Sequence, residues 1–169
     1  MNRATKLQLL AALASLALWA LPGAGLVLLP LELLNTHIHE FCHAVVALAT
    51  GGQVGYIRVL STGDGVTPVL GGNAILTASA GYVGAAILGG LMLLSTRTEK
   101  GARTALMIAA FALTLSMTLW VRGDIAGVAS GLLWIFLLFA MARGLKGDTL
   151  IFAAQFIGIQ QCLRTVQSL

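Results

Sequence analysis

Charged side chains are scarce in this sequence. Only 9% of its 169 residues are Asp, Glu, Lys or Arg, whereas 58% are hydrophobic. An average soluble domain contains about 25% charged residues, so a chain of this length has too little polar material to cover a water-exposed surface. The scarcity excludes an ordinary soluble domain and indicates an integral membrane protein.

Cysteine is equally scarce. Cys42 and Cys162 are far apart in separate apolar runs, which excludes a disulfide framework. The net charge is +4, but the basic residues lie in short connections between apolar runs. Basic residues in such places contact lipid headgroups. We therefore expect a lipid bilayer, and no nucleic acid, among the partners.

Charge-free apolar runs are abundant, and several approach or exceed the ~20 residues that a membrane-crossing helix needs. Charges and helix breakers divide the chain into helices expected at 7–21, 25–50, 74–95, 104–121, 125–142 and 149–166. The sequence thus predicts an all-α integral membrane fold of about six transmembrane helices, in a single polytopic domain of residues 1–169.

Two stretches depart from the helical pattern. Residues 51–73 are rich in glycine and contain β-favouring pieces at 54–57 and 65–67, which predicts a short β-like hairpin or membrane-dipping loop. The N-terminal run ends at Pro22-Gly23 and partly resembles a secretory signal; an uncleaved first span followed by a tight turn explains the same residues.

Charge does not orient the six-span topology, because the basic residues divide five against five between its two sides. One side holds Arg3, Lys6, Arg58, Arg122 and Arg164, and the other holds Arg97, Lys100, Arg103, Arg143 and Lys146.

The second expected helix contains a His-Glu-x-x-His motif formed by His39, Glu40 and His43. Positions i and i+4 lie on one helix face, so the two histidines can present their imidazoles to a single Zn²⁺. Glu40 lies one residue along, where it can act as general base toward a metal-activated water. Ionisable residues in an apolar helix are costly unless something satisfies them. A metal site would satisfy them and is the preferred interpretation; the alternative is that these side chains only hydrogen-bond neighbouring helices.

An ordered set of motifs follows the zinc motif: Ala49-Thr50-Gly51-Gly52, Gly65-Val66-Thr67, Gly71-Gly72 and Ala80-Gly81-Tyr82-Val83-Gly84. Together with His39-Glu40-Phe41-Cys42-His43-Ala44, this set resembles the compact branch of the site-2 protease family of intramembrane metallopeptidases. The resemblance is clear over residues 36–95 and implies a metallopeptidase core at about 25–142.

The resemblance implies an intramembrane zinc metalloendopeptidase. Such an enzyme cleaves a transmembrane or membrane-proximal peptide bond of a membrane-protein or peptide substrate, and its active site is reached from the cytosolic half of the bilayer. It also implies that residues 54–67 form an edge to which an unwound substrate adds as a strand, ending at Pro68. Compactness favours a bacterial inner (cell) membrane.

Catalytic zinc takes three protein ligands plus water, and the family's Leu-Asp-Gly setting for the third is missing here. The candidates are Asp64, Asp124 and Asp148. Asp124 is the preferred candidate, because alternating spans place it on the same side as His43. Asp124 can equally pair with Arg122 and cap the fifth helix.

Several other polar residues have structural interpretations. Asn35 either orients a zinc ligand or caps a helix, and His37 points away from the face of the zinc motif. Glycines in the third helix form a packing face. The glutamines of the last helix are expected to make interhelical hydrogen bonds; they are Gln155, Gln160 and Gln161.

Two other functions compete with the peptidase. The family's Leu-Asp-Gly setting is missing, so a catalytically inactive scaffold that binds membrane clients is one alternative. The end of the last helix also lacks the acidic residue that the resemblance to compact relatives implies there. A small metal transporter that uses His37, His39 and His43 is the other. The placement of Glu40 as a base and the absence of an inverted repeat argue against the transporter.

Overall fold

A computed structural model describes residues 2–167, which form six helices and four two-residue strands. The helices are α1 (Arg3–Ala20), α2 (Gly25–Ala49), α3 (Ala74–Ser95), α4 (Glu99–Leu119), α5 (Ile125–Gly144) and α6 (Gly147–Gln167). The predicted helices are confirmed. The start of α4 lies five residues before the expected 104, because the hydroxyl of Thr98 accepts a hydrogen bond from the Gly101 amide and caps the helix there.

Three of the described helices, α3, α4 and α5, are long and apolar enough to cross a membrane. Large apolar side chains on their outer faces are widely exposed, as an apolar solvent permits. Examples are Ile75, Leu91, Ile108, Phe111 and Phe136. The chain is therefore a mostly helical, multi-pass membrane protein.

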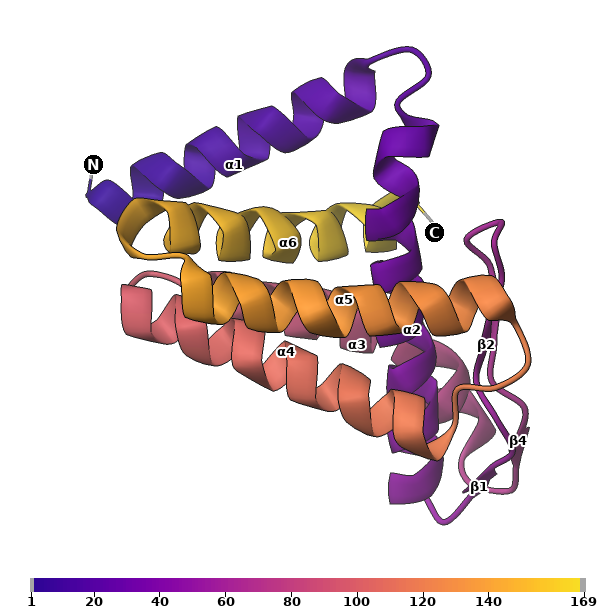
Figure 1. The fold of residues 1–169 in the computed structure, drawn as a ribbon. Helices are drawn as coiled ribbons and strands as arrows, with labels where there is room; N and C mark the ends of the chain where they lie inside the picture. Colours follow the sequence, from indigo (N-terminus) through magenta and orange to yellow (C-terminus); the bar gives the residue numbers. More distant parts are fainter. Residues whose placement is uncertain (1, 168–169) are drawn as a thin grey trace.

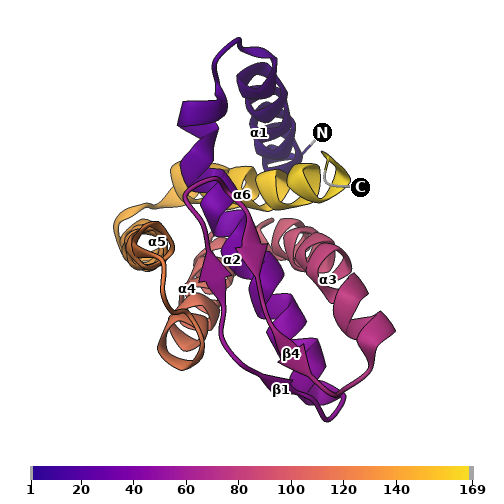
Figure 2. The ribbon, with the colours of Figure 1, turned by 90° about the vertical axis from the view of Figure 1, so that its right-hand side faces the viewer.

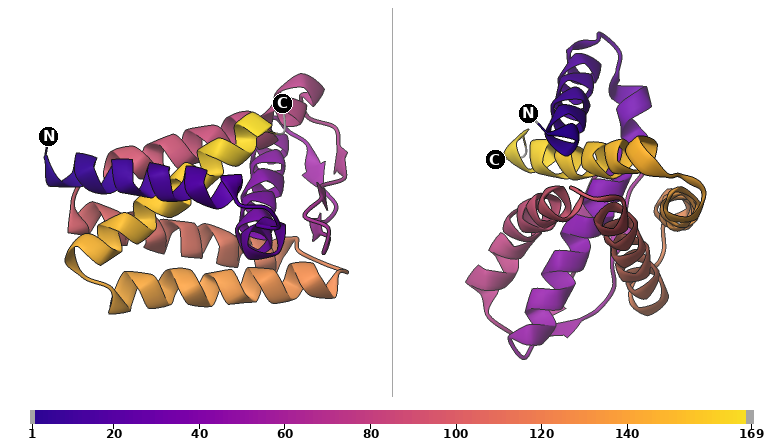
Figure 3. Two further views of the ribbon diagram at one scale, coloured as in Figure 1. Left: turned by 90° about the horizontal axis from the view of Figure 1, so that it is seen from above. Right: turned by 90° about the vertical axis from the view of Figure 1, so that its left-hand side faces the viewer.

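Helix α2 runs across the direction that the other helices share (Figure 1). Seen from above, α2 is viewed almost end-on while α1, α4 and α5 are viewed from the side (Figure 3). It passes between α3 on one side and α4 and α5 on the other (Figure 2). Helix α2 is therefore flanked by other helices on both sides. It crosses them, and it is not one of a series of parallel spans that alternate in direction.

Two hydrogen bonds from aromatic rings attach α2 to α5. The Nε2 atom of His37, which is fully buried, lies 3.0 Å from the Gly127 carbonyl oxygen. The indole N–H of Trp134 donates to the Pro30 carbonyl oxygen at 2.6 Å. As predicted, His37 points away from the zinc-motif face, and its contact with α5 gives it a structural role.

Helix α1 lies alongside α6 and runs in the same direction. Near its start, Gln155 of α6 donates to the Ala4 carbonyl oxygen at 3.2 Å. Further along, Gln160 accepts from the Trp19 indole at 3.0 Å and donates to the Ser15 hydroxyl at 3.3 Å. The interhelical role predicted for these two glutamines is confirmed.

The expected five-against-five division of basic residues is wrong, because α2 does not act as an alternating span. The starts of α1, α4 and α6 meet at one end of the bundle, where Arg3 pairs with Asp148 (Figure 1). Seven of the ten basic residues lie at this end. They are Arg3, Lys6, Arg97, Lys100, Arg103, Arg143 and Lys146. The positive-inside rule favours a cytosolic position for this end.

The predicted hairpin follows α2, which ends where Gly51 adopts a left-handed conformation with φ +84°. Strands β1 (Gln53–Val54) and β4 (Val69–Leu70) pair antiparallel, as do β2 (Arg58–Val59) and β3 (Gly65–Val66). The outer edge of the first half of the hairpin, which contains β1 and β2, is occupied, since Ile57 forms a parallel bridge with Val121, two residues after the end of α4. The hairpin lies over α2 (Figure 2).

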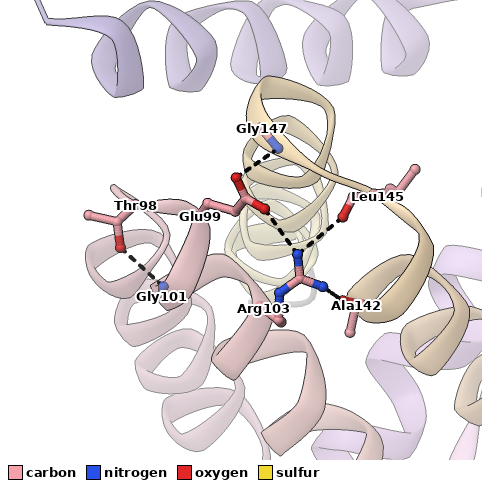
Figure 4. Close-up of polar contacts among 7 residues, drawn as sticks. All are labelled: Thr98, Glu99, Gly101, Arg103, Ala142, Leu145 and Gly147. Carbon is pink, nitrogen blue, oxygen red and sulfur yellow. Dashed lines mark hydrogen bonds and ion pairs between the residues drawn. The ribbon is translucent and has the colours of Figure 1, made fainter.

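At the basic end of the bundle, Arg103 and Glu99 link the start of α4 to the end of α5 and the start of α6 (Figure 4). The guanidinium of Arg103 in α4 donates to the carbonyl oxygens of Ala142 and Leu145 at the end of α5 and pairs with Glu99. The same Glu99 accepts from the Gly147 amide at the start of α6, at 3.0 Å. One ion pair thus satisfies unpaired backbone groups at the ends of two helices.

We predict that Arg103→Met destabilises the protein by about 1 to 2 kcal/mol, because the carbonyls at the end of α5 lose a charged donor. Thermal unfolding of the detergent-solubilised protein measures the effect. Arg143→Met is the control, since Arg143 is exposed near the end of α5. Equal melting temperatures for the two variants would refute the role of Arg103.

Candidate metal centre

The residues of the zinc motif converge as expected on one side of α2. His39 and His43 are one helical turn apart, and their Nε2 atoms lie 3.0 Å from each other. One donor atom each from His39, Glu40 and His43 lies within 4.8 Å of the others. Glu40 is buried, and the two histidines are half-buried. The three residues therefore form a compact set of nitrogen and oxygen donors.

A backbone carbonyl of α3 determines the tautomer of His43. Its Nδ1 atom lies 2.6 Å from the Thr77 carbonyl oxygen, and a carbonyl only accepts hydrogen bonds, so Nδ1 carries the proton. The Nε2 atom of the neutral ring then has a free lone pair, which faces His39. Hydrogen bonds of this kind orient metal-binding histidines.

Helix α3 approaches the histidines closely because Gly81 has no side chain. A Cβ atom at Gly81 would collide with the Nε2 atoms of both His39 and His43. The next residue, Tyr82, packs its ring edge-on against His39, with a centroid distance of 4.5 Å. The glycine face predicted for this helix thus packs against the zinc motif itself.

The hairpin covers the other side of the site and holds Glu40. The hydroxyl of Thr67 donates to Oε2 of Glu40 at 2.6 Å. Gly65 lies so close that a Cβ atom there would be 2.6 Å from Oε1 of the same carboxylate. One turn earlier on α2, Thr36 donates to the Gly63 carbonyl oxygen at 2.6 Å, which anchors the hairpin beside Glu40.

A family model described as Peptidase M50B-like matches residues 9–169, which is nearly the whole chain. The chain belongs to this family. The resemblance to site-2 proteases is therefore confirmed. No curated protein and no solved structure matches the chain significantly.

The donor set of this M50B-like chain fits zinc, the metal of the family. Zinc binds imidazole nitrogens at about 2.0–2.1 Å, so one ion can reach two Nε2 atoms that are 3.0 Å apart. Both histidines offer the same ring atom, and His43 is already in the tautomer that binding requires. The carboxylate of Glu40 adds an oxygen as the third donor of the group.

The three aspartates considered for the third ligand lie outside this donor group. Asp124 caps α5: its Oδ1 accepts from the amides of Ala126 and Gly127 at 2.8 and 3.1 Å. Asp64 is hydrogen-bonded within the hairpin tip, and Asp148 pairs with Arg3 at the opposite end of the bundle. The capping interpretation of Asp124 is confirmed. The pairing with Arg122 is not, because that guanidinium donates to the carbonyl oxygens of Thr118, Leu119 and Val121. The role of Asp124 as a zinc ligand stays a prediction.

Two residues that position the site could not be selected from the sequence. Thr67 lies in one of the motifs of the resemblance, but nothing in the sequence indicated its bond to Glu40. Thr77 acts through its main-chain carbonyl, which every residue type possesses. Asn35, a candidate for orienting a ligand, has a buried side-chain oxygen without a hydrogen-bond partner among the described residues.

We predict that Gly81→Ala abolishes metal binding, because its methyl group would occupy the space of the two ring nitrogens. The metal content of the purified protein measures this effect.

Gly90→Ala is the matched control on the same helix, because a Cβ atom at Gly90 meets nothing within 4 Å. This variant is expected to keep its metal and to gain up to about 1 kcal/mol of helix stability. Full zinc content in Gly81→Ala would show that α3 does not confine the site.

Proposed function

We propose that this protein is an intramembrane zinc metalloendopeptidase that cleaves a transmembrane or membrane-proximal peptide bond of a membrane-protein substrate in a bacterial cell membrane. The observation that carries this proposal is the pair of His39 and His43 Nε2 atoms, 3.0 Å apart, with the Glu40 carboxylate in the same donor group. Membership of the M50B-like family supports it.

Each residue of the motif has a distinct role in this proposal. His39 and His43 hold the metal, and the Thr77 carbonyl keeps the His43 ring oriented. A bound zinc ion supplies Lewis acidity, which lowers the pKa of water and polarises the scissile carbonyl. Glu40 accepts the proton of the attacking water and returns it to the leaving amine. Thr67 holds one oxygen of this carboxylate in place.

The free edge of the hairpin suggests how a substrate strand is presented. The edge at Ile57 is taken by Val121, so an added strand would pair with the other half of the hairpin, at residues 65–67, before Pro68 interrupts the row of backbone donors. Thr67 in that half contacts Glu40. A strand added there would run beside the general base, which supports strand addition as the mode of substrate binding.

We predict that Glu40→Gln keeps zinc but loses cleavage by at least about a hundredfold, since general acid–base catalysis contributes roughly 10²–10⁴. Metal content and cleavage of a reconstituted membrane-protein client are measured on the same preparation. Unchanged cleavage would exclude the peptidase mechanism, and the absence of zinc in the parent protein would favour the inactive scaffold.

Substitutions of Thr67 test whether its hydroxyl positions Glu40 for catalysis. Thr67→Val removes the hydroxyl that holds Glu40 while preserving the shape of the side chain, and it is expected to lower kcat with little change in zinc content. Thr67→Ser restores the hydroxyl and should recover activity. Equal activity of the Val and Ser variants would contradict the positioning of Glu40 by the hairpin.

The second candidate function, an inactive membrane scaffold, is favoured by one observation: no aspartate joins the donor group among the described residues. We propose Asp124 as the third ligand because it begins α5 where that helix packs against the hairpin that holds Glu40: a Cβ atom at Gly127 would collide with the Val59 carbonyl oxygen. A ligand role requires its carboxylate to turn toward the histidines.

We predict that Asp124→Ser lowers the zinc content and leaves the melting temperature of the metal-free protein nearly unchanged, because serine caps helices about as well as aspartate. Asp124→Ala is the paired variant that also loses the cap. If Asp124→Ser binds zinc as well as the parent, Asp124 is a cap only.

A further inference from the structure

A cavity lies between α2, α3 and α4, with further lining residues from α5 and α6. It has a volume of about 370 Å³, and none of the zinc-motif residues lines it. Its walls are almost entirely apolar, with Met92 of α3 and Ala105 and Ala109 of α4 among them. The volume falls within the roughly 300–1,000 Å³ of small-molecule pockets.

The cavity opens toward the bilayer. Three residues that line it, Leu88, Leu91 and Ile108, are also 44%, 56% and 62% exposed on the surfaces of α3 and α4. Both helices are candidate membrane spans, so molecules that reach this opening come from the lipid phase.

Four polar side chains line this apolar cavity: His37, Ser95, Ser116 and Gln161. Of these, His37 and Ser116 are completely buried. Neither the Nδ1 atom of His37 nor the hydroxyl of Ser116 has a hydrogen-bond partner among the described residues. The Nε2 atom of His37 faces the Gly127 carbonyl oxygen at 3.0 Å and therefore carries the ring proton. Its Nδ1 atom is then an acceptor, and Ser116 can donate or accept.

The cavity is long enough for an extended hydrocarbon chain. Its wall on α4 runs from Ala105 to Ser116, which corresponds to about 16 Å at 1.5 Å per residue. Ser116 lies at one end of that wall, so a chain along α4 would have one end beside the polar group.

We propose that this cavity binds a single-chain lipid with a free hydroxyl or undissociated carboxyl group. The chain lies between α3 and α4, and its polar end donates to Nδ1 of His37 and bonds the hydroxyl of Ser116. An ester has no proton to donate to His37, so the acyl chains of phospholipids are poorer ligands. This site is separate from the peptidase chemistry proposed above.

The test uses the full chain in phosphatidylcholine nanodiscs with three photoreactive probes: hexadecanoic acid, 1-hexadecanol and methyl hexadecanoate. Mass spectrometry of the labelled peptides locates the bound chain. The acid and the alcohol are expected to label α3 and α4 around the cavity saturably, and the methyl ester roughly tenfold less, since it leaves a buried acceptor unpaired. Equal labelling by the ester, or displacement by phospholipid as effective as by the free acid, would overturn the assignment.

Two kinds of substitution test the contacts of the hydrocarbon chain and those of its polar end separately. Ala109→Phe fills the cavity and should abolish saturable labelling by all probes, whereas Ala129→Phe, on the exposed face of α5, should not. Ser116→Ala should weaken labelling by the acid and the alcohol but not by the ester, and it tests the proposal even if Ala109→Phe fails to fold. Labelling that is unaffected by Ser116→Ala, or spread evenly over the outer face of α5, would refute the site.

Discussion

The cost of placing ionisable side chains in an apolar helix is the constraint on which the structure depends. Helix α2 carries His37, His39, Glu40 and His43 in a chain with few charges, and unpartnered groups of this kind are expensive in a membrane. A different element supplies a partner to each side of the helix: α5 to His37, α3 to His43, and the hairpin to Glu40. The crosswise path of α2 through the bundle lets all three elements reach it (Figure 2).

The hairpin connects α2 to the segment that follows α4. It is anchored to α2 by Thr36 and Thr67 and to the end of α4 by the bridge between Ile57 and Val121. Glycine at position 65 lets its backbone lie against the Glu40 carboxylate. The segment proposed to pair with a substrate strand is therefore the same segment that holds the carboxylate proposed as general base. In that proposal, a few hydrogen bonds would couple substrate binding to the position of the base.

Much of this could be predicted from the sequence, because it depends on local patterns. Apolar runs and breakers predicted the helices, glycine and β-branched residues predicted the hairpin, and the spacing of His39 and His43 predicted their shared face. The course of α2 could not be predicted, since alternating spans are only the simplest arrangement, and the division of basic residues was wrong for that reason. The resulting charge bias favours the hairpin end on the non-cytosolic side, opposite to what the family resemblance implied. The contacts of Thr67 and Thr77 depend on packing between distant segments, which no local pattern encodes.

The hydrogen bond to the Thr77 carbonyl oxygen determines which amino-acid substitutions around this site would be tolerated. Because the partner of His43 Nδ1 is a main-chain atom, no substitution at position 77 deletes it. A saturation mutagenesis scan would record that position as permissive for any side chain that fits, although its main-chain carbonyl sets the tautomer of His43, a proposed metal ligand. The sensitive positions would appear instead at Gly81 and Gly84, where an added methyl group would press against His39, His43 and Cys42 and push α3 away from α2. Variation at the glycines, more than at the threonine, would therefore report on this hydrogen bond.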